Sequence, residues 1–242
     1  MSIAEKLTAI AENEKKVFDA GCSEGESNMW DKITNYGNRK FYEYGFKYWG
    51  CEEFNPTYQI VPTSRSICMF EDSPKLKKVE SRYLDLSNVT ANNGAENTSN
   101  NYCTFRRCSA LEEIEDVGMP PGGYYQTFGW CYNLHTVAAM RCKKEGGYTS
   151  PFNSCTRLRN LTIEGVIGNN FTVAHSSLLT KDSIISIITA LFDFTGTADE
   201  YTRTLTLHSK TVSTLESLGS TSPNGNTWIE YIDDKKWNLT VA

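Results

Sequence analysis

Residues 105–114 read Phe-Arg-Arg-Cys-Ser-Ala-Leu-Glu-Glu-Ile, and this stretch decides the fold because its spacing recurs along the chain. A phenylalanine is followed at +3 by cysteine, at +6 by leucine and at +9 by a branched or leucine side chain. The same pattern begins at Phe128 and Phe152, and an earlier copy begins at Phe70 with Ser73 in the cysteine position. The last three copies lie 23 and 24 residues apart, a period typical of stacked repeats.

Stacked repeats bury their apolar side chains only against neighbouring repeats, so the same side-chain size must return once per period. The pattern therefore predicts a mainly β leucine-rich-repeat solenoid with one short strand per repeat of about 23 residues. Cysteine serves there as a small, readily buried apolar side chain, so we expect Cys108, Cys131 and Cys155 to form a buried ladder of free thiols. Metal or redox chemistry is the alternative, but no basic or imidazole side chain recurs beside them.

The chain divides into four expected segments. Residues 1–21 form an N-terminal helix with Ser2 and Glu5 as a capping box, residues 22–66 form a hinge and an aromatic cap, residues 67–169 hold the repeats, and residues 170–242 form an α/β cap. The helix either packs on its own domain or joins chains into a homo-oligomer. The aromatic segment either covers the open end of the repeats or offers rings on which a glycan stacks.

In the last segment, a broad apolar face predicts a helix that begins after Thr180 and runs through Leu191. Tyr201–His208 alternates as a strand, a second helix spans Lys210–Leu218 and stops at Gly219, and Trp237–Val241 forms a closing strand.

Composition excludes several functions. The formal net charge of −5 argues against a nucleic-acid partner, because proteins that bind nucleic acids normally present a basic face. No apolar run reaches the roughly 18 residues that are needed to span a membrane. No apolar leader opens the sequence, so we expect reduced thiols. Phosphate-binding, nucleophile-elbow and zinc-protease motifs are missing, so we expect no enzyme, no metal and no cofactor. A Cys–His nucleophile stays open, because spatial partners are invisible in sequence.

The Phe–Cys–Leu–Ile signature over residues 67–169 resembles the bacterial surface-antigen class of leucine-rich repeats. It departs from that class where Glu115 and Asp116 follow Ile114 in place of the usual Leu-Pro pair. Together with the opening residues 1–13, the aromatic segment ending at Pro62 and the stretch 178–184, the chain is similar to leucine-rich-repeat proteins encoded in phages and prophages of gut Firmicutes. The resemblance implies a tail-associated virion protein, made in the host cytoplasm, that recognises the host.

We therefore expect a non-catalytic binding protein whose partner is a protein or a cell-surface glycan. The alternative is an adhesin on the bacterial cell surface, or a monomeric protein–protein interaction scaffold. Outward-facing positions of the predicted strands are the candidate ligand contacts, although solvated polar surface is the other interpretation of each. These positions are Lys77, Lys78, Glu112, Glu113, His135, Thr136, Arg159 and Asn160.

Overall fold

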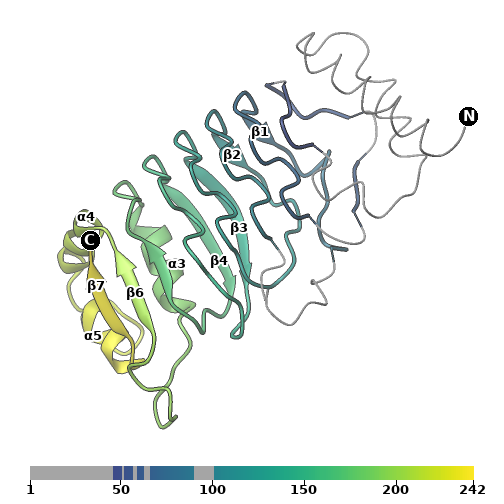
Figure 1. Cartoon of the computed structure of the whole chain (residues 1–242). Helices are drawn as coiled ribbons and strands as arrows, with labels where there is room; N and C mark the ends of the chain where they lie inside the picture. The colour runs from purple at the N-terminus through teal and green to yellow at the C-terminus, as the bar shows by residue number, and fades with distance from the viewer. Residues whose placement is uncertain (1–45, 51, 57–58, 63–65, 90–100) are drawn as a thin grey trace, which may run out of the picture.

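The computed structural model describes residues 46–50, 52–56, 59–62, 66–89 and 101–242. These residues form two parallel sheets and three α-helices, and Figure 1 shows successive turns of the chain lying side by side along the molecule. The first sheet has the order β1 (Lys78–Val79), β2 (Glu113–Ile114), β3 (Thr136–Cys142), β4 (Asn160–Gly165). The second has the order β5 (Phe171–Val173), β6 (Thr204–Leu207), β7 (Asn238–Val241). The helices are α3 (Lys181–Thr189), α4 (Ser209–Ser217) and α5 (Trp228–Asp234).

The predicted fold class, a mainly β leucine-rich-repeat solenoid, is wrong. The described chain is an α/β structure, with a four-stranded sheet, a separate three-stranded sheet and three helices. Strands β1 and β2 contain only two residues each, so the early repeats contribute little sheet. After β5 the chain forms a helix, because residues 184–188 have an apolar pattern of helical period. The predicted helix over residues 1–21 lies outside the described residues.

Within the first sheet, the aligned positions of the sequence pattern do share one register. Val79 pairs with Ile114, Ile114 with Val137, and Val137 with Leu161, all in parallel. All four side chains are at most 2% exposed. Equal register follows from equal side-chain size at equivalent positions, since a slip of one residue would turn each buried side chain toward solvent.

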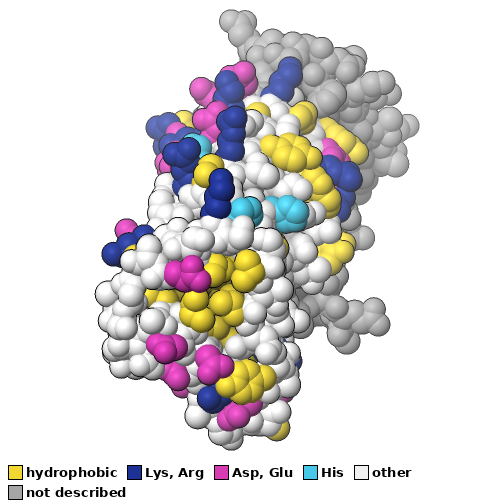
Figure 2. Space-filling view, turned by 90° about the vertical axis from the view of Figure 1, so that its left-hand side faces the viewer, with side chains coloured by type: hydrophobic (Ala, Val, Ile, Leu, Met, Phe, Trp, Pro, Cys, Tyr) yellow, Lys and Arg dark blue, Asp and Glu magenta, His cyan; other side chains and the backbone are white. Residues whose placement is uncertain are grey.

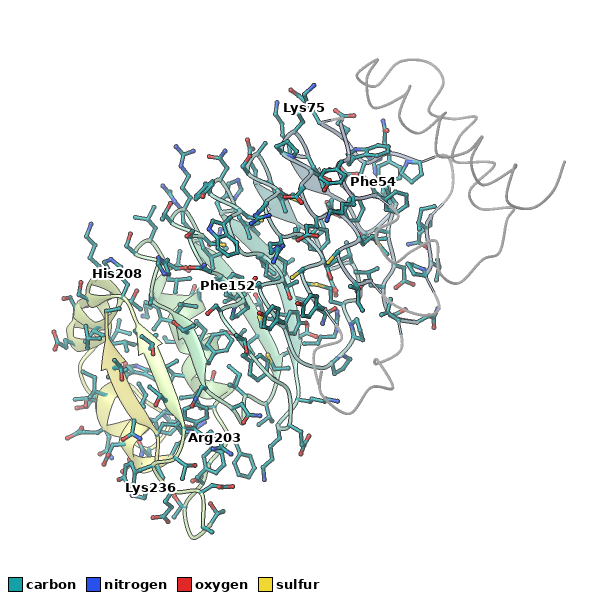
Figure 3. All side chains as sticks on the ribbon, in the orientation of Figure 1. Phe54, Lys75, Phe152, Arg203, His208 and Lys236 are labelled. Carbon is teal, nitrogen blue, oxygen red and sulfur yellow. The ribbon has the colours of Figure 1, made fainter. Side chains whose placement is uncertain are left out.

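The leading phenylalanines form a continuous column in the core. The ring centroids of Phe70 and Phe105 lie 5.4 Å apart, those of Phe105 and Phe128 5.9 Å, and those of Phe128 and Phe152 5.2 Å, with the rings nearly parallel. Phe46 extends the column, 5.1 Å from Phe70. In Figure 3, Phe152 lies near the middle of the molecule and Phe54 marks the N-terminal end of the aromatic core. The position of Phe46 reveals an earlier packing layer that the sequence pattern missed.

The cysteine at +3 has a specific hydrogen-bond role. The Cys108 thiol donates to the Phe70 carbonyl at 3.0 Å. In the next two repeats, Cys131 donates to the Phe105 carbonyl and Cys155 to the Phe128 carbonyl. Ser73 occupies this slot in the first repeat, and its hydroxyl donates to the Phe46 carbonyl at 3.2 Å. The predicted ladder is confirmed in that Cys108, Cys131 and Cys155 are buried and free. The slot therefore selects a small side chain that also carries a donor.

Helix α3 closes the open edge of β4. Its N-cap is Thr180, as predicted, and the side chain accepts a hydrogen bond from the Ser183 backbone. The Ser183 hydroxyl accepts from the Leu161 amide at 2.9 Å, and the Ser186 hydroxyl accepts from the Ile163 amide at 2.8 Å. Two helix side chains thus take the place of a fifth strand, which leaves fewer amides at an edge that could pair with another chain.

The C-terminal part confirms most of the predicted elements. Helix α3, strand β6, helix α4 and strand β7 fall inside the expected ranges or within one residue of them, and Gly219 follows α4 with a positive φ of 62°. Strand β5 and helix α5 were not predicted, although Thr227 and Glu230 form a capping box at the start of α5. The buried Lys235 ammonium donates to three carbonyls at the C-terminal end of α3, at 2.6–3.3 Å. Because Lys235 is the C-cap residue of α5, these bonds join α5 to α3.

The cysteine slot gives a first test. Cys108→Ala removes the donor to the buried Phe70 carbonyl, so we expect the free energy of unfolding in urea to fall by about 1–3 kcal/mol. Cys108→Ser should lose clearly less, because its hydroxyl can donate as Ser73 does. Equal losses in the two variants would show that the hydrogen bond contributes nothing.

Candidate binding surface

The eight candidate residues of the sequence lie in two adjacent rows across the first sheet. In one row, backbone amides donate to the previous repeat: Glu112 to Lys77 at 2.8 Å, His135 to Glu112 at 2.9 Å and Arg159 to His135 at 3.0 Å. In the other, Lys78, Glu113, Thr136 and Asn160 share one register. The structure thus brings all eight together on neighbouring strands, and each side chain is exposed or half-buried. We call this face the strand rows.

The lysines at the N-terminal end of the strand rows form ion pairs with nearby glutamates. The Lys77 ammonium lies 2.6 Å from a Glu52 carboxylate oxygen, and the Lys78 ammonium lies 2.9 Å from Glu115. Glu115 also accepts hydrogen bonds from the backbone and side chain of Ser81, both at 3.0 Å. The hydrogen bond from Lys78 lowers the pKa of Glu115 from its usual range. These side chains have internal partners, so they are less available to a ligand.

The C-terminal end of the strand rows is polar and carries little charge. The Thr136 hydroxyl lies 3.0 Å from Nδ1 of His135 and accepts from the Asn160 amide at 3.2 Å. Neither the imidazole Nε2 nor the Asn160 amide oxygen bonds to another described residue, and each has the capacity for a further hydrogen bond. The Arg159 carbonyl accepts from Thr180 and Ser183, which fixes its backbone at the start of α3. The Arg159 side chain is exposed, and within the described part of the chain it makes no ion pair.

A second charged group follows β2 and was missed by sequence analysis. The Arg141 guanidinium bonds both carboxylate oxygens of Asp116 at 2.6 Å and lies 3.0 Å from Glu164. This joins three successive repeats. The hydrogen bond to Asp116 raises the pKa of Arg141 and lowers that of Asp116. The sequence pattern ended at the +9 position, so it gave no sign that Asp116, Arg141 and Glu164 are neighbours.

An aromatic and charged edge lies two positions after the phenylalanine column. Tyr48, Asp72, Arg107 and Trp130 all have positive φ angles, from 59° to 64°, and each donates its amide to the next repeat. Arg107 lies 3.5 Å from Asp72, and its guanidinium carbon lies 5.6 Å from the Trp130 ring centroid. Tyr48 is 52% exposed. A left-handed conformation at a recurring position leaves no signal in these residue types, so sequence analysis missed this edge.

Beneath this edge, a buried carboxylate is held between two cations. Glu71 is 2% exposed, its carboxylate lies 2.7 Å from the Lys47 ammonium, and it forms an ion pair with Arg106. Burial raises the pKa of Glu71, but the hydrogen bond from Lys47 and the charge of Arg106 outweigh it, and the net pKa falls below its ordinary 4.5. The group therefore stays ionised at neutral pH, which favours the folded state.

Among the described residues, one group could supply three ligands to a metal ion. The Cys68 and Cys103 sulfurs and a Glu71 carboxylate oxygen lie within 4.8 Å of one another, and all three residues are buried. The carboxylate already bonds two cationic side chains, which disfavours a third positive charge. The strand rows lie on different elements, so this group is separate from them.

Figure 2 views the molecule from its C-terminal end. Most of the lysine and arginine side chains on this face lie in its upper half, with some acidic side chains among them, while the lower half shows mainly uncharged, apolar and acidic side chains. Val241, on the outer strand β7, is 53% exposed. In the described residues, no helix is both long and apolar enough to cross a membrane.

In comparisons with known proteins, no family model, no curated protein and no solved structure matches this chain.

The buried carboxylate gives a test with a pH signature. Glu71→Gln removes the buried negative charge that Lys47 and Arg106 share, so we expect a loss of about 3 kcal/mol in free energy of unfolding at pH 7. Because the folded pKa of Glu71 lies below its unfolded value, its contribution is present above about pH 5 and disappears as pH falls through the folded pKa. Urea unfolding from pH 7 to pH 3 should thus show a gap between the two proteins that narrows as the pH falls. A constant gap across that range would contradict the assignment.

Proposed function

We propose that this is a non-catalytic recognition protein that binds a bacterial surface ligand through the C-terminal end of the strand rows. One observation carries the proposal: charged side chains at the N-terminal end are held by internal ion pairs, whereas His135, Thr136, Arg159 and Asn160 present hydrogen-bonding groups to solvent. An enzyme would need reacting groups with a shared cavity, and the strand rows offer an open face.

The chemistry of this end favours a polyhydroxyl ligand over a highly charged one. Hydroxyl, amide and imidazole groups can both donate to and accept from sugar hydroxyls, and a single guanidinium adds one positive charge that can bind a carboxylate or phosphate substituent. Fixed backbones on strands β3 and β4 hold these groups in place before binding, which reduces the ordering cost of association. A cell-wall glycan fits these features.

The virion part of the proposal rests on the resemblance to phage and prophage repeat proteins. In that setting the protein is tail-associated, is made in the host cytoplasm, and is held in an assembly by residues 1–21, which lie outside the described residues. The alternative is an adhesin or a monomeric interaction scaffold. Both functions use the same binding face, so the ligand experiment applies to each.

The proposal is tested by cosedimentation of the full-length protein with purified Gram-positive cell walls. The double variant Arg159→Ala/Asn160→Ala should bind at least 10-fold more weakly, because it removes two hydrogen-bonding side chains from the proposed contact. Lys77→Ala/Lys78→Ala is the matched control, since it changes the same two rows three repeats earlier and should bind within about twofold of the wild type.

Two outcomes contradict the proposal. Equal weakening by both double variants would show that nonspecific charge attraction drives sedimentation. A wild-type protein that stays in solution with cell walls would exclude this ligand class and put the interaction scaffold first.

A further inference from the structure

Cys68 and Cys103 occupy the same position in successive repeats, two residues before the leading phenylalanine. The Cys68 amide donates to the Tyr102 carbonyl at 2.9 Å, and the Phe70 amide donates to the Thr104 carbonyl at 2.8 Å. Chains joined in this way lie about 5 Å apart, which falls inside the range of roughly 4.4–6.8 Å between α-carbons that a disulfide requires.

The two side chains leave the backbone in the same manner. Both residues have positive φ angles, 50° for Cys68 and 51° for Cys103, and their sulfurs belong to a group of ligand atoms that all lie within 4.8 Å of one another. The pair is therefore aligned along the stacking direction. A disulfide would bring the two sulfurs from within 4.8 Å of one another to about 2 Å, along the stacking direction.

The electrostatic environment treats the two thiols differently. The neighbouring Cys68 thiol lowers the pKa of Cys103, and the Arg106 charge lowers it further, although burial raises it. The neighbouring Cys103 thiol, together with burial and the Glu71 charge, raises the pKa of Cys68. Cys103 is thus the sulfur of the pair that more readily carries negative charge. A low-pKa thiol beside a second thiol is one feature of a reactive dithiol. Both residues are buried, Cys68 at 5% and Cys103 at 0% exposed, so the pair admits only a small oxidant such as hydrogen peroxide.

The other stacked cysteines are held in a different state. The thiols of Cys108, Cys131 and Cys155 each donate to a phenylalanine carbonyl. Burial raises the pKa of all three, to about 12 for Cys155. Stacking alone therefore does not make a thiol pair reactive in this protein.

We propose that Cys68 and Cys103 form a reversible disulfide when the protein meets a hydroperoxide. The Cys103 thiolate attacks one peroxide oxygen, the O–O bond breaks, and the sulfur becomes a sulfenic acid while the leaving oxygen takes up a proton. The Cys68 sulfur then attacks the Cys103 sulfur, the S–O bond breaks, and water leaves with the Cys68 proton. The two thiols lose two electrons, and the peroxide gains them.

A metal ion is a weaker match for the same residues. Zinc with two thiolates would need further ligands, but the Glu71 carboxylate is held by Lys47 and Arg106. These cations favour a thiolate and disfavour an added divalent ion. These residues are better suited to a two-electron oxidation of the two thiols, which leaves the Glu71 carboxylate and its two ion pairs unchanged.

The experiment uses the full-length reduced protein, treated with stoichiometric hydrogen peroxide, alkylated and analysed by peptide mass spectrometry. We expect one cross-linked pair of peptides that contain Cys68 and Cys103, with a loss of two hydrogen atoms that dithiothreitol reverses. The oxidised protein should unfold at a temperature higher by on the order of 5 °C, because the bond restricts the unfolded chain.

Variants separate this inference from general thiol oxidation. Cys68→Ser and Cys103→Ser should each abolish the cross-link, and Cys131→Ser, the matched control from the other ladder, should leave it intact. Alkylation of both Cys68 and Cys103 after peroxide treatment, or cross-links from either of them to another cysteine, would overturn the proposal. Purified protein that retains one zinc per chain, lost in both variants, would identify a metal centre in its place.

Discussion

The hydrogen bond from each +3 side chain to the carbonyl of the preceding phenylalanine is the constraint on which the repeats depend. It joins neighbouring repeats at a buried point. The Phe46, Phe105 and Phe128 carbonyls also accept from the backbone amide three residues on, so loss of the side-chain donor costs most at the Phe70 carbonyl. Because the donor and the aromatic ring belong to the same short stretch, satisfying this bond also stacks the phenylalanines and sets the register of the strands. The strand rows have the same register as the buried side chains beside them, so core packing determines how the candidate binding residues line up.

The same constraint explains which parts of the fold could be predicted from sequence. The return of apolar side chains of similar size at equivalent positions predicted the alignment of four residues, which the structure shows in one register: Val79, Ile114, Val137 and Leu161. Local signals also worked, as with the Thr180 N-cap of α3. The fold class could not be predicted correctly, because strand length depends on backbone pairing between distant segments. A two-residue strand and a seven-residue strand carry the same pattern of side chains.

The candidate site shows a similar division. Alternation along a strand predicts which side chains face outward, and all eight candidates lie in two rows. Their partners could not be predicted, since the ion pair between Lys77 and Glu52 joins residues 25 positions apart. Cys68 and Cys103 were missed for a related reason. They lie outside the four positions of the sequence pattern, and the backbone hydrogen bonds and the proximity of their sulfurs show that they are neighbours.

The central claim is that ligand binding occurs at the C-terminal end of the strand rows. Hydrogen–deuterium exchange of the full-length protein, with and without soluble fragments of Gram-positive cell wall, tests it most directly. The account predicts slower exchange in peptides that cover residues 132–138 and 156–164, with residues 74–80 unchanged. Protection centred on residues 74–80 or on the C-terminal helices, or no protection at saturating fragment concentration, would contradict it.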